Sequence, residues 1–134
     1  MHPDLSGLIG IPFVQNGRNP AQGLDCWGLC MEVFRRYGID VPDFQMACYD
    51  AFQIHDAVES ERPFWIRLDE PEDGCLVLFA LDAFAPDIIQ HLGVYVGEGR
   101  ILHTLEKRGS SLIRLNDRFF GKKMRGFYRW NGSR

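Results

Sequence analysis

The residues best suited to chemistry in this chain are one cysteine and two histidines. Cys26 stands in the stretch Gly23-Leu24-Asp25-Cys26-Trp27-Gly28, where a run with helical periodicity begins. A cysteine in the first turn of a helix meets unpaired backbone N–H groups and the positive end of the helix dipole, which favour thiolate over thiol. A nucleophilic cysteine needs this environment. The alternative role, a small core residue, suits Cys30, one turn further along, better than Cys26.

His91 and His103 lie on either side of an expected hairpin turn at residues 97–99. Antiparallel pairing around this turn predicts that they stand roughly opposite each other, with Cβ atoms about 4.5–5.5 Å apart. One imidazole can then act as a base toward the cysteine while the other orients it, as in a generalised catalytic triad. Each histidine alone is equally compatible with a hydrogen-bonded strand residue. His2 and His55 have no such context and are left unassigned.

A helix is expected over residues 25–37, where it positions the cysteine. From Cys26 the apolar residues recur at i, i+3, i+4, i+7, i+8 and i+11, which is one face of an α-helix. Asp25 stands where a helix is capped, and Gly38 stands where a helix usually stops. These signals place Cys26 in the first turn.

The second half of the chain is typical of antiparallel strands. Strands are expected at residues 75–81, 91–97, 100–105, 112–115 and 124–130. Weaker signals predict a short helix at 4–9, a loop at 13–22, a helix at 50–61, an extended segment at 64–68 and a helical turn at 116–120. Helices followed by strands predict an α+β domain, with the cysteine helix packed on an antiparallel sheet of about four to six strands.

Composition narrows the classes of function. The 134 residues suggest one domain, residues 1–134. The chain has 15 basic and 18 acidic residues, which gives a net charge of −3. It has no basic tract of the kind that would indicate a nucleic-acid partner. No apolar run approaches the roughly 20 residues of a membrane span. The N-terminus has no signal-peptide pattern, so synthesis in the cytoplasm is expected. The four cysteines lack metal-ligand spacing and are interpreted as thiols, with no metal and no cofactor.

Several blocks of the sequence resemble the NlpC/p60 family of cysteine peptidases. Residues 23–29 resemble its Asp-Cys-Ser/Trp-Gly-Leu signature, and residues 91–97 resemble its His-Val-Gly-Ile-Tyr-Leu-Gly strand. Residues 101–104 match the following strand, which carries the family's third catalytic residue, and residues 71–79 are similar to its Pro-Gly-Asp-Leu-Val-Phe strand. The blocks stand in the family's order and cover about residues 7–106.

The resemblance implies a fold, an activity and a set of roles. The fold is a circularly permuted papain-like fold, with an N-terminal helix carrying the cysteine packed on an antiparallel sheet. Cys26 would be the nucleophile, His91 the general base and then acid, and His103 the residue that orients His91. Family members mostly cut bacterial cell-wall stem peptides, often between D-glutamate and a diamino acid. The chain is therefore expected to be a cysteine endopeptidase acting on peptidoglycan peptides.

Four further residues are candidates for substrate binding or for the oxyanion site: Trp27, Asp25, Phe13 and Gln15. The family usually has tyrosine where this chain has Phe13, and a phenyl ring cannot donate a hydrogen bond. Gln15 or Asn16 could take over that role.

Two other functions remain open at this point. Tryptophan after the cysteine, in a short single domain, is most similar to members encoded beside phage and prophage tail genes, so phage tail proteins are expected as partners. A non-catalytic tail-assembly module on the same fold is one alternative, favoured by the missing tyrosine and disfavoured by the intact catalytic groups. An acyltransferase with the same groups and a different acceptor is the other.

Overall fold

The computed structural model describes residues 2–44 and 50–132. Two α-helices and two 3-10 turns lie among eight strands in these ranges. In chain order they are β1 (Arg18–Asn19), β2 (Gly23–Leu24), α1 (Cys26–Arg36), α2 (Ala51–Glu61), η1 (Arg62–Phe64), β3 (Trp65–Leu68), β4 (Leu76–Phe79), β5 (His91–Tyr95), β6 (Arg100–Leu105), β7 (Gly109–Arg114), η2 (Phe120–Lys122) and β8 (Met124–Trp130).

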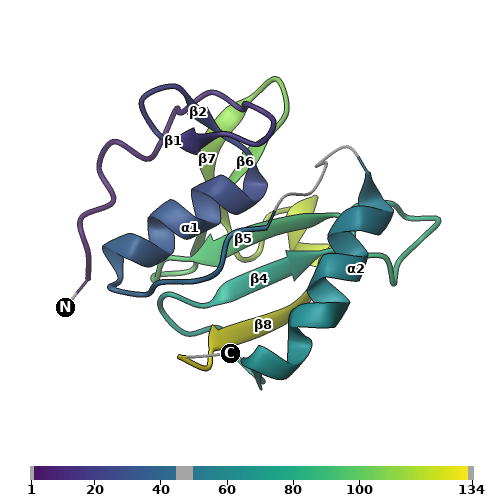
Figure 1. The fold of residues 1–134 in the computed structure, drawn as a ribbon. Coiled ribbons are helices and arrows are strands. Elements are labelled where there is room, and N and C mark those ends of the chain that lie inside the picture. The colour runs from purple at the N-terminus through teal and green to yellow at the C-terminus, as the bar shows by residue number, and fades with distance from the viewer. Residues whose placement is uncertain (1, 45–49, 133–134) are drawn as a thin grey trace.

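Six of the strands form one antiparallel sheet in the order β3-β8-β4-β5-β6-β7. The last strand of the chain, β8, thus lies between β3 and β4 (Figure 1). Helix α1 packs across β5 and β6, while β1 and β2 form a small separate hairpin. The sheet has the predicted size, and the prediction of an α+β fold with the cysteine helix on an antiparallel sheet is confirmed.

Alternation along the strands divides the apolar side chains between the two faces of the sheet. On one face, side chains of α1 and of the strands form the larger core, which includes Leu29, Val33, Phe34, Leu78, Leu92, Val94 and Leu102. A smaller cluster is built on Val77, Phe79 and Ile101, with half-buried neighbours that include Phe120. Because side chains in a strand alternate between faces, this second cluster belongs to the opposite face.

Most predicted elements agree with the structure to within a few residues. The helix and the strands at 100–105 and 124–130 are confirmed, while those at 75–81 and 91–97 are shorter than predicted and the one at 112–115 begins earlier. The weak helix and the extended segment correspond to α2 and β3, and the expected turn at 116–120 is displaced to η2. The loop at 13–22 contains β1, which the sequence did not predict.

The predicted helix at residues 4–9 is wrong. Instead, this segment runs along β7 and is bound by it: Ser110 donates to Leu8 O at 2.7 Å, and Gly10 N donates to Ser110 O at 2.8 Å. Gly7 and Gly10 both have φ of +84°, outside the helical region. Tertiary hydrogen bonds to the sheet therefore replace the local ones of a helix.

Candidate active site

Cys26 is the first residue of α1, as predicted. Asp25 is its N-cap, and the side-chain Oδ1 accepts the Gly28 N–H at 2.8 Å. The first turn contains no acidic side chain to oppose a thiolate. Cys26 is buried, with 3% of its surface exposed. The thiol therefore lies at the positive end of the helix dipole in surroundings of low polarity.

Asp25 is fully buried and is surrounded by donors. Besides capping α1, its carboxylate accepts hydrogen bonds from Arg18 at 2.6 Å and from the Asn16 N–H at 3.0 Å. Arg18 in turn donates to Asp43 and to Phe44 O, both at 2.8 Å. With 0% of its surface exposed, Asp25 has no face toward a substrate. The structure instead makes it the anchor of the turn that carries Cys26.

His91 and His103 form a buried hydrogen-bonded pair. His91 Nε2 lies 2.8 Å from His103 Nδ1, and the rings meet edge to face at 5.0 Å between centroids. Their exposed fractions are 4% and 1%. The predicted pairing is therefore confirmed as a contact, but not its register. Val94 pairs with Leu102, so that His91 and His103 are diagonal rather than opposite neighbours.

Burial controls the charge of the histidine pair. Burial, together with a smaller effect of the neighbouring His103, lowers the pKa of His91 to about 3. Burial likewise lowers the pKa of His103 to about 4, although the Asp117 carboxylate acts in the opposite direction. Both imidazoles are consequently neutral at pH 7. A neutral His91 can accept a proton. An imidazolium at rest would need a nearby thiolate to compensate for the free-energy cost of burying its charge.

The direction of α1 brings its first turn toward the beginning of β5. At the other end of the helix, the Tyr37 hydroxyl donates to Asp73, and the adjoining Gly74 N–H donates to Tyr95 O at 2.8 Å. The C-terminus of α1 thus lies beside the end of β5. Since α1 packs on β5, its N-terminus points toward the end of the sheet where β5 starts with His91 (Figure 1).

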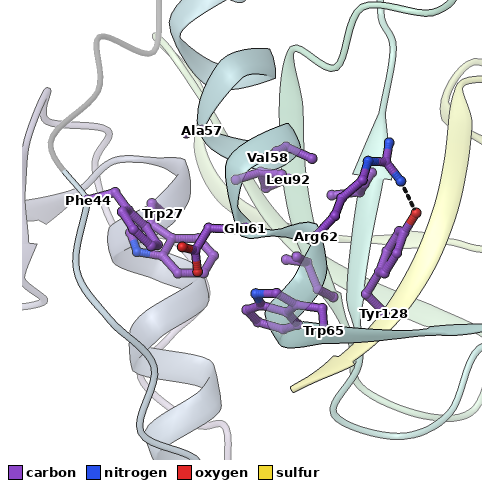
Figure 2. Close-up of a pocket in the computed structure, with 11 residues that line it drawn as sticks. Trp27, Phe44, Ala57, Val58, Glu61, Arg62, Trp65, Leu92 and Tyr128 are labelled. Carbon is purple, nitrogen blue, oxygen red and sulfur yellow. Dashed lines mark hydrogen bonds between the residues drawn. The ribbon is translucent and has the colours of Figure 1, made fainter. Parts of the chain in front are cut away.

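Trp27 faces the core beside this turn. Its indole N–H donates to Pro42 O at 3.0 Å, and its rings contact Phe34, Phe44 and Trp65. It lines a pocket between α1, α2 and the sheet. Figure 2 shows this pocket, including the hydrogen bond between the side chains of Arg62 and Tyr128.

Phe13 and Gln15 lie on the segment that leads into the β1–β2 hairpin, and both are half-buried. Phe13 forms an isolated parallel bridge with Leu24, two residues before Cys26. Gln15 Nε2 donates weakly to the Asn16 side chain at 3.4 Å. This bridge places the backbone of Phe13 beside the turn that carries Cys26. The family usually has tyrosine at this position.

Sequence reasoning missed three residues that organise this site. Arg18 is not among the predicted site residues, yet its side chain donates to the Asp25 carboxylate. The ring of Phe120 packs on both histidines, and His55 of α2 accepts the Ile89 N–H at 3.0 Å, two residues before His91. The Phe120 and His55 contacts join segments that are far apart in the sequence, so no local pattern indicates them. Arg18 reaches Asp25 across the short β1–β2 hairpin, which the sequence did not predict.

The thiols and possible ligands complete the inventory. Cys26, Cys30 and Cys75 are thiols, as expected, while Cys48 lies outside the described residues. Burial raises the pKa of Cys75 to about 11. In residues 2–44 and 50–132, no group of three or more His, Cys, Asp or Glu side chains is placed to hold a metal. No helix in these ranges has the length and apolar character needed to cross a bilayer.

The sequence matches the model of the NlpC/P60 family over residues 10–129. Two similar proteins come from Bacillus subtilis (strain 168). The bifunctional muramidase/DL-endopeptidase CwlT is 33% identical over 95 residues, which cover 71% of this chain and 25% of that protein. The gamma-DL-glutamyl hydrolase is 29% identical over 124 residues, which cover 92% of this chain and 27% of that protein. The chain thus spans about a quarter of the length of these relatives.

The fold is also similar to that of solved structures. An NlpC/P60 family protein from Bacillus cereus ATCC 10987 superposes with a TM-score of 0.66 at 22% identity, covering 92% of this chain and 36% of that chain. At this identity the likeness is one of fold. It agrees with the predicted papain-like α+β architecture, whereas the circular permutation stays a prediction.

Proposed function

Because this chain belongs to the NlpC/P60 family, we propose that it is a cysteine endopeptidase acting on peptidoglycan stem peptides. Proteins of this family are cysteine endopeptidases of peptidoglycan peptides. The observation that carries the proposal is the buried His91–His103 hydrogen bond of 2.8 Å, at the end of the sheet toward which the Cys26 turn points. The proposal requires the Cys26 thiol, His91 and His103 to meet at this end of the domain.

In the proposed acylation step, His91 accepts the proton of the Cys26 thiol. The thiolate sulfur attacks the scissile carbonyl carbon, and the C–S bond forms while the carbonyl oxygen becomes an oxyanion. Backbone N–H groups of the Cys26 turn stabilise this oxyanion. The C–N bond then breaks, and the imidazolium of His91 gives its proton to the departing amine. Throughout, His103 keeps the His91 ring in one orientation and tautomer.

In the proposed deacylation step, a water molecule attacks the thioester carbon. His91 accepts a proton from this water, the C–S bond breaks, and the Cys26 sulfur is reprotonated as the carboxylic acid product leaves. His91 is unprotonated at rest because burial lowers its pKa, and the thiolate or oxyanion formed beside it would compensate for charging the buried ring in each transfer. No metal or cofactor takes part in either step.

The scissile bond is proposed from the relatives. One is named a DL-endopeptidase and the other a gamma-DL-glutamyl hydrolase. The first name points to a bond between a D and an L residue, and the second to a γ-glutamyl bond. We therefore propose cleavage between D-glutamate and the diamino acid of the stem peptide. Mass spectrometry of purified cell-wall fragments after incubation with the protein identifies the products directly.

Point variants test the roles. Cys26→Ala and His91→Ala should each abolish turnover, because nucleophile and base act as a unit. His103→Asn should keep more activity than His103→Ala, since an amide oxygen can still accept a hydrogen bond from the imidazole. Cys30→Ala is the matched control: this buried core residue should affect stability and leave the chemistry nearly unchanged. Activity lost in Cys30→Ala but kept in Cys26→Ala would overturn the assignment.

Incorporation into a phage tail remains a prediction, as does the non-catalytic alternative. Thiol alkylation near neutral pH separates a peptidase from an inactive module. Cys26 should react quickly if the site activates it, and Cys75 serves as an internal reference because burial raises its pKa to about 11. Equal, slow rates at both cysteines would favour the inactive module.

A further inference from the structure

The ring of Phe120 covers the histidine pair. Its centroid lies 4.8 Å from that of His103, with the rings nearly perpendicular at 80°. It lies 6.2 Å from the ring of His91 and 6.0 Å from that of Phe79, which itself contacts His91. Two phenyl rings therefore pack against the imidazoles on the side of the second apolar cluster.

A tight turn fixes the backbone beneath Phe120. The Asp117 carboxylate accepts the Phe119 N–H at 3.0 Å and the Phe120 N–H at 2.9 Å. Gly121 N donates to Asp117 O at 2.9 Å, and Ala80 N donates to Lys123 O at 2.9 Å, which ties the turn to the end of β4. The ring is thus held by backbone hydrogen bonds as well as by packing.

The adjacent Phe119 provides a contrast within the same turn. It is 53% exposed, with the Lys123 ammonium 5.4 Å from its ring centroid, and its ring meets that of Phe120 edge to face at 4.9 Å. Phe120 is half-buried on the histidines. Phe119 and Phe120 are neighbours in the sequence, yet Phe119 faces solvent and Phe120 faces the candidate site.

Resting on the proposed function, we propose that Phe120 is a positioning residue of the peptidase. Its ring holds His103 edge-on, so that Nδ1 stays aligned with His91 Nε2, and it excludes water from that hydrogen bond. Water that reached the pair would compete for both nitrogens, and a rotated His103 would leave His91 without its orienting partner. A hydrogen bond in surroundings of low dielectric also gains strength that solvent would remove.

Kinetics of single variants test this role. The substrate is the tripeptide L-alanyl-γ-D-glutamyl-L-lysine, and the variants are Phe120→Ala, Phe120→Leu and, as the matched control, Phe119→Ala. Phe120→Ala should lower kcat about 10-fold to 100-fold with KM little changed, because misplacing a catalytic group affects the transition state. Phe120→Leu should recover part of kcat by refilling the space, and Phe119→Ala should match the wild type. Wild-type kcat in Phe120→Ala would overturn the inference.

A spectroscopic measurement separates this inference from the proposed function. The proton shared by His91 and His103 should give a downfield ¹H NMR signal that is protected from exchange with water. Phe120→Ala should lose the signal by rapid exchange, and Phe119→Ala should keep it. If the wild-type protein cleaves no stem peptide, the proposed function fails while this signal still tests the role of Phe120. If Phe120→Ala does not fold, the exchange rate in Phe120→Leu decides, and a rate equal to wild type contradicts the role.

Discussion

Replacing Asp25 by alanine tests how the fold holds the nucleophile. The substitution removes the cap of α1, which is worth about 1 kcal/mol in typical helices. It also removes a buried acceptor for Arg18, at 2.6 Å, and for the Asn16 N–H, at 3.0 Å. Hydrogen bonds to charged groups contribute about 1.5–3 kcal/mol each, but Arg18 keeps its bonds to Asp43 and to Phe44 O. We therefore expect Asp25→Ala to lower the free energy of unfolding by about 3–4 kcal/mol.

Urea denaturation measures this loss, and Asp43→Ala is the control. Asp43 pairs with the same guanidinium but has 42% of its side chain exposed, so its removal should cost under about 1 kcal/mol. The loss in the free energy of unfolding for Asp25→Asn should lie between those of the other two variants. The new amide group would place its own N–H donors against one of the donors that surround the carboxylate. kcat should fall with Asp25→Ala as the Cys26 turn loosens. A loss below about 1 kcal/mol in Asp25→Ala would refute this reasoning.

Three other outcomes are expected. Burial lowers the pKa of both paired histidines, so the folded state binds fewer protons than the unfolded state. The free energy of unfolding should therefore be highest above pH 6.5 and fall toward pH 4, by on the order of 2–4 kcal/mol at pH 5. Urea midpoints that do not change with pH would contradict the burial of neutral imidazoles. Gly93→Ala should lower stability and kcat together, because its Cβ would lie 3.0 Å from the Ile101 side chain and 3.3 Å from His103 Cβ; a wild-type melting temperature would argue against this close fit. His55→Asn should retain more activity than His55→Ala, since only the amide can accept the Ile89 N–H; equal rates would exclude a role for this bond.

The sequence predicts the local elements of the site well. Helix α1 follows from the apolar spacing after Cys26 and from the Asp25 cap, which are interactions between near neighbours in the chain. The hairpin of β5 and β6 follows from its turn residues. The register of β5 and β6 differs from the predicted one because the hairpin is centred on Glu98, with a hydrogen bond between Val96 and Arg100, and not on Gly97. A shift of one residue at the turn moves the facing residue on the opposite strand by two.

Local sequence patterns do not indicate which segments far apart in the chain come into contact. The position of β8 between β3 and β4 depends on pairs such as Trp65 with Trp130, which no spacing rule indicates. The N-terminal segment lost its expected helix to hydrogen bonds with Ser110, about 100 residues later in the chain. The ring of Phe120 reaches the histidines only after these contacts exist. Sequence reasoning therefore identifies the chemical groups, and tertiary structure decides what surrounds them.

The insertion of the last strand has a consequence for how the chain matures. Strand β8 supplies the hydrogen-bonding partners of both β3 and β4, so β3 stays apart from the rest of the sheet until β8 pairs with both strands. Helix α1 and the β5–β6 hairpin can form before β8 joins the sheet, because their own hydrogen bonds join residues close together in the sequence. Pairings of high sequence separation, such as those of β8 with β3 and β4, form slowly. We therefore expect the sheet that supports the site to be completed late in folding, when β8 pairs with β3 and β4.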